Sequence, residues 1–373
     1  MVARVPAVSI SLHSNQERRR KMAKEISRRD FVKTGLASAA VAGATGLGAA
    51  KAFGKSNAKF KWRMQTHWPS GTEYYNNVYV AFCDKVREAT NGEVDITPYP
   101  PNTIVPTKDV LEAVGRGLFE VALLYPAYWI GRLPVGGHVC GQLFTWENLE
   151  ETWLFFFEMG AIDIFREAYA EYGVHLIGPI VCSGIAVFSN RALRTPEDWK
   201  GYKIRSTGIP AAVFEKMGAT PVYFPGAELY QALQTGVCEG AHWGAIYNGW
   251  EMKFQEVTKY IILPFMARVS NCEIFMTQKL WKKLPSDVKQ VLESCVLDVS
   301  VKMQSSSRYG DYLKIEEFQK KGYGEIVTMD DKSVEMLKKY SIDVIDEYSK
   351  KDPKYCGRAG ELLKEFLRIR ARI

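Results

Sequence analysis

Most of the short motifs that mark enzyme active sites are absent from this chain of 373 residues. There is no HExxH zinc motif, no GxSxG nucleophile turn and no GxGxxG dinucleotide loop. Residues 48–56 resemble a phosphate loop, but five residues separate the two glycines instead of four, and no strand precedes them. These absences weigh against an enzyme, although a catalytic triad cannot be read from one sequence.

Metal-binding spacings are also absent. His67, His138, His175 and His242 lie far apart, and no CxxC pair occurs. Seven cysteines are scattered along the chain: Cys83, Cys140, Cys182, Cys238, Cys272, Cys295 and Cys356. One disulfide would be compatible with an oxidising compartment, but the spacing favours buried free thiols.

Excess positive charge is lacking outside the N-terminal segment. The formal net charge is +7, and residues 1–52 hold ten lysines and arginines against three acidic residues. The remainder of the chain is therefore formally neutral. Since a nucleic-acid-binding protein carries its basic excess on the folded domain, the sequence predicts no nucleic-acid partner.

Residues 1–52 have the order of an export signal. A basic stretch leads into residues 27–33 with the pair Arg28 and Arg29, and a weakly apolar run of alanine and glycine ends at Ala50-Lys51-Ala52. The arginine pair resembles the twin-arginine signal. We predict export by that route, cleavage near Ala52 and a periplasmic mature protein; the alternative is a basic amphipathic helix that stays attached. No later run approaches the roughly 18 apolar residues of a membrane span.

From residue 59 onward, short β-like runs alternate with helical ones. Strands are expected at residues 59–66, 93–100, 119–126, 174–180, 184–190, 201–207, 219–224 and 238–243. Helices are expected at residues 72–90, 107–115, 147–172 with a break near Gly160, 209–217, 227–234, from 247, and at 285–319, 331–350 and 360–373. This alternation predicts an α/β protein with largely parallel sheets, which bind ligands at the carboxyl ends of strands or between two domains.

Arg205 is the first candidate for a binding residue. It ends a short expected strand with the apolar neighbours Tyr202 and Ile204, and a Ser-Thr-Gly loop follows. An arginine at a strand end that faces a cleft offers a fixed bidentate fork for a carboxylate. On the residues alone, a surface arginine that solvates the strand end is an equally good interpretation.

Around Arg205 the chain reads "WKGYKIR", "GIPAAVFEKMGATPV" and "PGAELYQALQTGVCEG" in this order. These runs resemble the solute-binding (DctP-type) proteins of TRAP transporters, the tripartite ATP-independent periplasmic systems. Residues 93–131 are similar to the first-domain core of that family, and the resemblance extends from about residue 60 to residue 350.

The resemblance implies an α/β, two-domain periplasmic binding protein fold with hinge strands, a long connecting helix and C-terminal helices. Residues 1–52 would be the signal peptide, 53–180 mainly domain I and 181–275 mainly domain II. Residues 276–373 would be the long helix and the C-terminal helices that return to domain I.

The function implied by the resemblance is that of a receptor without enzymatic activity. It would capture a small organic acid, a monocarboxylate such as a 2-oxo, 2-hydroxy or aromatic acid, and deliver it to permease subunits in the inner membrane. Two alternatives stay open: a periplasmic enzyme with His242 as the base, and a sensory module for a receptor kinase. A homodimer through the C-terminal helix is also left open.

The resemblance further implies that Arg205 grips the substrate carboxylate. Within the family, the runs "ALQTGV" and "PAYW" are most similar to the subgroup that binds 2-oxo acids. In that subgroup the strand after "ALQTGV" ends in a Glu-Trp pair, and the glutamate helps to hold a metal ion. Here the pair is His242-Trp243. Trp243 would form a pocket wall or, alternatively, pack in the core.

His242 departs from this pattern. Since Na⁺ and Ca²⁺ prefer oxygen ligands, we expect no metal of that kind and no cofactor. His242 would donate a hydrogen bond to a ligand oxygen or be a satisfied histidine at the pocket rim.

Weaker candidates share a position near the expected cleft: His67, Trp68, Tyr125, Tyr128, Trp129, Ser183 and Asn248. Core packing is the alternative for Tyr125, Tyr128 and Trp129. Ser183 lies where many relatives place a second ligand-contacting side chain. The absence of an arginine there favours a monocarboxylate or an aromatic acid over a dicarboxylate.

Overall fold

The computed structural model describes residues 58–224 and 226–371, so the expected export signal lies outside the described residues. The strands are β1 Phe60–Thr66, β2 Val94–Tyr99, β3 Val121–Leu124, β4 Val174–Ser189, β5 Lys203–Arg205, β6 Thr220–Val222, β7 Gly240–His242, β8 Tyr260–Thr277 and β9 Glu325–Thr328. The helices are α3 Ala81–Ala89, α4 Val110–Gly115, α5 Leu149–Trp153, α6 Ala161–Ala170, α7 Gly208–Lys216, α8 Leu229–Gln234, α9 Ile246–Glu251, α10 Gln278–Trp281, α11 Ser286–Lys320, α12 Asp331–Lys351 and α13 Arg358–Arg370.

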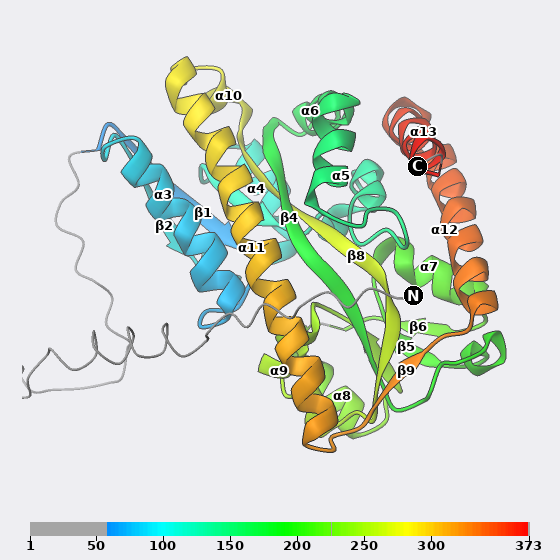
Figure 1. Ribbon diagram of the computed structural model, residues 1–373. Coiled ribbons are helices and arrows are strands. Elements are labelled where there is room, and N and C mark those ends of the chain that lie inside the picture. Colours follow the sequence, from blue (N-terminus) through cyan, green and yellow to red (C-terminus); the bar gives the residue numbers. More distant parts are fainter. Residues whose placement is uncertain (1–57, 225, 372–373) are drawn as a thin grey trace, which may run out of the picture. The chain divides into compact units, whose positions relative to one another are not determined.

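These described strands form one nine-stranded sheet in the order β2-β1-β3-β8-β4-β7-β5-β6, with β9 paired to β8 (Figure 1). The two longest strands, β4 and β8, run antiparallel to each other through the middle of the sheet. Strands β1 to β3 extend it on one side, and β5 to β7 on the other. The α/β class that the sequence predicts is confirmed.

The expectation of largely parallel pairing is only partly correct. β1 is parallel to β2 and β3, and β5 is parallel to β6 and β7. β8 is antiparallel to β3 and β4, however, and β4 is antiparallel to β7. The sheet is therefore mixed, because the long pair β4 and β8 connects two parallel halves.

Two features of the strands differ from the sequence pattern. The expected strands at 174–180 and 184–190 form one strand, since Cys182 and Ser183 stay paired with Ser270 and Val269. The pattern also did not indicate β8 or β9. In β8, residues 269–277 are buried on both faces, so the polar and apolar alternation that marks a half-exposed strand is missing.

The long helix α11 packs along β4 (Figure 1) with Val296, Val299 and Met303 in the shared core. Its polar residues hydrogen bond with the backbone of β4 at residues 181 and 182, which pair with β8 on one side but lie beyond the reach of β7 on the other. Val181 N donates to Ser300 Oγ at 3.1 Å, and Gln304 Nε2 donates to the carbonyl oxygen of Cys182. The helix thus satisfies buried backbone groups as well as covering apolar ones.

Two further features concern the C-terminal helix and the cysteines. α13 packs within the chain, where Leu363 and Phe366 are buried in the core that contains α6. All seven cysteines are buried and unpaired, as the spacing favours. Among the described helices, none has both the length and the apolar character needed to cross a bilayer.

Candidate ligand-binding site

The carboxyl ends of strands from both halves of the sheet meet over the middle of β4. The end of β3 lies level with Pro179, because Leu124 and Pro179 both pair with Glu273. The end of β7 lies level with Val187, the partner of His242. Since β7 and β3 run in opposite directions along the β4–β8 pair, the residues that follow them converge on residues 180–186 of β4. This is the position expected for a ligand in an α/β sheet.

Arg205 is the buried cation of this region. It is the last residue of β5 and is 8% exposed. Its Nε donates to the carbonyl oxygen of Phe224 at 3.2 Å, and its two terminal nitrogens make no hydrogen bond within the described residues. Burial lowers the pKa of the guanidinium, but an arginine stays charged in proteins. Arg205 therefore presents a charged fork with two open donor positions.

Three tyrosines surround this guanidinium. The Tyr223 ring centroid lies 5.6 Å from the Arg205 Cζ. Tyr128 and Tyr125 are near enough to interact with Arg205 electrostatically. Tyr128 is 37% exposed as a whole, but burial raises its pKa to about 12, and burial raises the pKa of Tyr125 well above its usual value. The phenols of Tyr125 and Tyr128 are therefore neutral at physiological pH.

Close packing fixes Tyr125. Its hydroxyl lies near Ser270 of β8. Gly141, with φ +69°, lies so near that an added Cβ would be 2.9 Å from the Tyr125 oxygen. A glycine is needed there for the backbone conformation and for the space.

His242, at the end of β7, is 4% exposed and packs edge to face against Phe214, with ring centroids 5.3 Å apart. Burial, with the charge of Arg205 as a smaller cause, lowers its pKa to about 3. The ring is therefore neutral and carries one N–H. Nδ1 lies 3.5 Å from Ser206 Oγ, and Nε2 is buried without a hydrogen-bond partner in the described part of the chain.

Trp243 is half-buried. It lies beside Gly226, two residues after Phe224, whose carbonyl oxygen accepts a hydrogen bond from Arg205. Its ring packs against Phe254 with centroids 5.6 Å apart. An added Cβ at Gly226 would lie 3.1 Å from the Trp243 Nε1. Since the carbonyl oxygen of Phe224 accepts from Arg205, residues 224 and 226 connect the two predicted site residues.

The family is decided by the extent of the match. Residues 64–352 match the family model for bacterial extracellular solute-binding protein, family 7. The chain belongs to this family. Its homologues are TRAP periplasmic solute-binding proteins, which bind small ligands and work with membrane permease components.

Individual relatives agree with this assignment. The monocarboxylate 2-oxoacid-binding periplasmic protein of Nostoc sp. is 23% identical over 297 residues, 78% of this chain and 80% of the relative. A TRAP solute-binding protein of Pseudoalteromonas atlantica with bound sodium and pyruvate is 20% identical, with a TM-score of 0.75 over 84% of this chain and 95% of the other. A protein of Bordetella bronchiseptica with calcium and picolinate is 22% identical, with a TM-score of 0.74 over 84% and 94%.

Family membership confirms the periplasmic binding protein fold and the expectation that the protein is not an enzyme, because these relatives are solute-binding receptors. The alternative of an enzyme with His242 as its base is thereby dropped. The receptor belongs to a periplasmic family.

In this receptor Ser183 and Asn248 have partners within the chain. The Tyr74 and Ser183 hydroxyls lie 2.6 Å apart, and Tyr74 follows β1, so this contact links the first half of the sheet to the middle of β4. Asn248 Oδ1 accepts from Ala245 N at 3.1 Å and holds the start of α9. Asn248 thus has a local structural role.

The remaining candidates lie around Tyr128 or in the core. The rings of His67 and Tyr128 are 5.6 Å apart, and those of His67 and Trp68 are 5.2 Å apart. Trp129 is 1% exposed and donates from Nε1 to the Tyr169 hydroxyl at 3.1 Å, so its core interpretation is the one the contacts favour.

Tyr223 and Tyr74 were not found from the sequence. Tyr223 lies near the end of the strand that was expected at 219–224 and directly after the observed β6, and an aromatic residue at a carboxyl end was the available indication. Nothing in the sequence near Tyr74 indicated its contact with a serine 109 positions away.

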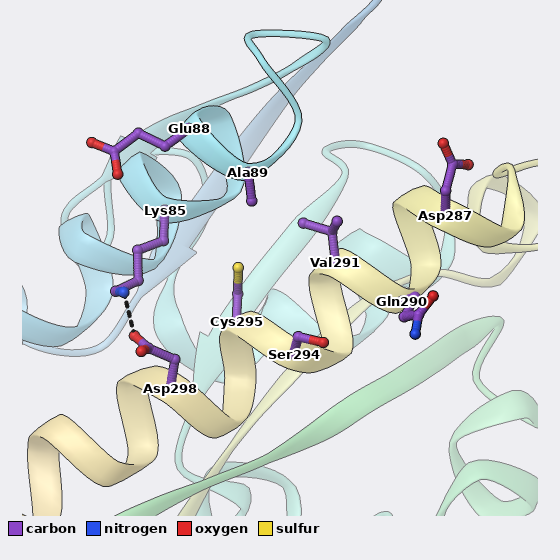
Figure 2. A pocket seen from close by; sticks show the side chains of 9 residues that line it. All are labelled: Lys85, Glu88, Ala89, Asp287, Gln290, Val291, Ser294, Cys295 and Asp298. Carbon is purple, nitrogen blue, oxygen red and sulfur yellow. Dashed lines mark ion pairs between the residues drawn. The ribbon is translucent and has the colours of Figure 1, made fainter.

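A surface hollow of about 700 Å³ lies elsewhere, between α3 and α11 (Figure 2). Its wall contains the ion pair of Lys85 Nζ with Asp298 Oδ2 at 2.6 Å and further polar side chains from both helices. None of the residues around Arg205 lines it. The hollow is therefore separate from the candidate site.

Proposed function

We propose that this receptor captures a small monocarboxylate, such as a 2-oxo, 2-hydroxy or aromatic acid, and delivers it to a membrane permease. The observation that supports this most is the buried Arg205 fork with two open donor positions among neutral side chains. A carboxylate would form two parallel hydrogen bonds with it. Tyr128, Tyr223 and Trp243 offer aromatic surface for the rest of the ligand.

The charge of the site favours a monoanion over a dianion. Arg205 is charged, but His242, with a pKa of about 3, is neutral. In the middle of β4, the side chain that could contact a ligand is the uncharged hydroxyl of Ser183. A second carboxylate would be buried without a cation, which is costly. We therefore place aromatic and 2-oxo monocarboxylates ahead of dicarboxylates.

We further propose that the protein has two lobes with the boundaries expected from the sequence, residues 53–180 and 181–275, followed by the returning segment 276–373. Closure of the lobes would exclude water from Arg205. The ligand would shift the balance between the open and closed forms by no more than the difference between its affinities for the two forms. Export through the twin-arginine route, with cleavage near Ala52, is part of the same proposal.

A panel of acids tests the proposed function. Thermal unfolding is measured with 2-oxo, 2-hydroxy, aromatic and dicarboxylic acids, each confirmed by titration calorimetry. A ligand at 100 times its dissociation constant adds about 2.7 kcal/mol of stability. Each kcal/mol raises the melting temperature of a domain of roughly 150–250 residues by about 2–4 °C, and less in a longer chain, so we expect a shift of about 5 °C. The proposal fails if no monocarboxylate gives a shift, or if dicarboxylates bind more tightly than all of them.

Solved structures of similar proteins contain bound sodium and pyruvate or calcium and picolinate, but we propose that no metal assists binding in this chain. The described residues contain no group of three or more His, Cys, Asp or Glu side chains that could hold a metal ion. His242 offers one nitrogen, packed against Phe214, where a hard cation requires several oxygens.

We therefore expect a chelator to leave binding unchanged. The dissociation constant of the best acid from the panel is measured with excess EDTA and in sodium-free buffer, and both values should lie within about twofold of the untreated value, well under the 1.4 kcal/mol of a tenfold change. A tenfold loss of affinity in either buffer, restored by adding sodium or calcium, would show that a metal takes part.

A further inference from the structure

The loop that follows β1 contacts both halves of the sheet. Residues 67–75 leave the carboxyl end of β1, which belongs to the half that contains β2 and β3. The backbone N–H of Glu73 nevertheless donates to Glu251 Oε1 at 3.2 Å. Glu251 is the last residue of α9, which follows β7 of the other half. We call residues 67–75 the strap.

A tight turn determines the path of the strap. The backbone N–H of Thr72 donates to the carbonyl oxygen of Pro69 at 3.3 Å, and the Thr72 hydroxyl donates to the same oxygen at 2.8 Å. Gly71, the third residue of this turn, has φ +88°, a conformation that favours glycine. The Thr72 hydroxyl also accepts from Tyr75 N at 3.3 Å. Residues 69–72 therefore turn the chain away from the end of β1.

One end of the strap lies at the candidate ligand site. The His67 ring contacts the rings of Trp68 and Tyr128, and Tyr128 interacts electrostatically with Arg205. The Trp68 ring centroid lies 5.3 Å from that of Tyr74. A series of aromatic contacts thus connects the surroundings of Arg205 with the middle of the strap.

The middle of the strap is bound to β4 and α11. The Tyr74 hydroxyl lies 2.6 Å from Ser183 Oγ of β4, and Ser307 Oγ of α11 donates to the Tyr74 oxygen at 3.4 Å. Burial raises the pKa of Tyr74, so the phenol is neutral. It can therefore donate to Ser183 while it accepts from Ser307.

The helix α9 is a firm support for Glu251. Tyr247 N donates to Asp311 Oδ1 at 2.8 Å, which binds the start of α9 to α11 (Figure 1). The Tyr247 ring lies against Gly310, where an added Cβ would be 2.9 Å from the ring. The two helices therefore pack as one unit, and Glu251 is carried by that unit.

The long strand pair β4 and β8 is irregular between the two halves of the sheet. Ile185 pairs with Ala267, but Val187 pairs with Ile262, so β8 contains extra residues over this stretch. The irregularity borders the part of β4 that pairs with β7. Strands bend where their pairing is interrupted in this way. The two halves are thus joined at a place where a hinge motion is easily accommodated.

We propose that the strap closes over the ligand site when the lobes close, and that Glu251 is the catch that holds it shut by accepting from Glu73 N. Glu251 is then a positioning residue, because its bond joins two parts of the protein and does not involve the ligand. The bond should favour the closed form to the same extent for every acid. This inference rests on the proposed function, since a catch has a role only in a receptor that opens and closes.

Dissociation kinetics test the catch. The release of pyruvate, lactate and benzoate from the full-length protein is followed by stopped-flow fluorescence, with Trp68 of the strap as one source of the signal. Glu251→Ala should raise the dissociation rate of each acid that binds by about three- to tenfold, the equivalent of one net hydrogen bond. The factor should be similar for all of them.

Two matched variants separate the catch from a general structural effect. Burial, with the charge of Glu73 as a smaller cause, raises the pKa of Glu251, so an uncharged acceptor suits this position. Glu251→Gln keeps an acceptor oxygen and should release the acids no faster than the natural protein. Glu256→Ala removes an exposed glutamate that pairs with Lys253 beyond α9, and it should leave the rates unchanged.

Cross-linking tests the closing motion. A short bifunctional maleimide joins the thiols of a Glu73→Cys, Glu251→Cys double variant, while the natural cysteines, which are all buried, stay unreacted. The linked strap should slow both entry and release of an acid by about tenfold or more, as a lid held shut would. The same link between Arg63→Cys and Glu120→Cys, an ion-paired position within one half of the sheet, should leave both rates unchanged.

Hydrogen exchange tests the strap without any acid. The Glu73 amide should exchange about threefold faster or more in Glu251→Ala, because it loses its acceptor, and at the natural rate in Glu251→Gln. Unchanged exchange in Glu251→Ala, unequal effects of this variant on the three acids, or unchanged rates in the linked protein would each overturn the proposal. If none of the acids bound the natural protein, the proposed function would fail, and the exchange rates would still decide whether Glu251 holds the strap.

Discussion

Arg205→Ala is expected to weaken binding of the carboxylate ligand at least a hundredfold. The guanidinium is 8% exposed and keeps two donor positions open. Removing one partner of a buried, hydrogen-bonded ion pair costs about 3–5 kcal/mol, because the other charge is then buried alone. Titration calorimetry with the best acid from the panel measures the change directly.

Two variants make this result specific. Arg205→Lys keeps the positive charge but loses the bidentate fork, so it should bind with intermediate affinity. Arg63→Ala removes an arginine of β1 that pairs with Glu120 at 3.0 Å outside the site, and it should bind normally. If Arg205→Ala kept its affinity within threefold while remaining folded, Arg205 would not be the carboxylate partner.

The strand that carries Arg205 was predicted because local features determine its position, whereas the role of Arg205 came from the family resemblance and stays a prediction. A three-residue strand, Lys203–Arg205, ends at this arginine, and the turn that follows leads into α7. The break near Gly160 was predicted for a similar reason, since this residue has φ +79° between two helical segments. Wherever turn residues and periodicity decide the conformation, the sequence alone is sufficient.

The rest of the site depends on contacts between distant segments. Tyr74 meets Ser183, and Tyr125 meets Ser270, only because β4 and β8 form one long antiparallel pair. That pair could not be predicted, since the apolar run in β8 is equally compatible with a buried helix. Tyr223 was missed because its role depends on its distance from Arg205, which the spacing of residues does not give.

The second large effect concerns a buried carboxyl group in the core. Glu273 of β8 is fully buried; its Oε2 accepts a hydrogen bond from the Tyr169 hydroxyl, while Oε1 has no hydrogen-bond partner in the described part of the chain. Burial raises its pKa to about 8, against about 4.3 for an unfolded chain. Between these values the unfolded state releases a proton that the folded state keeps.

Glu273→Gln is therefore expected to stabilise the protein increasingly as the pH rises. Below about pH 4.3 both states hold the proton, so the variant and the natural protein differ little in pH dependence. From there to about pH 8 the free energy of unfolding of the natural protein loses about 1.4 kcal/mol per pH unit through Glu273. Glutamine stays neutral and can still accept from Tyr169.

Urea unfolding of both proteins at pH 5, 6, 7 and 8 measures this difference. Subtracting the two curves cancels the contribution of the four buried or partly buried histidines, whose lowered pKa values act in the opposite direction. The gap should widen by several kcal/mol over the range, whereas Glu150→Gln, on the exposed side of α5, should show none. A constant gap would mean that Glu273 is ionised in the folded protein across this range, and that a group not yet identified stabilises its charge.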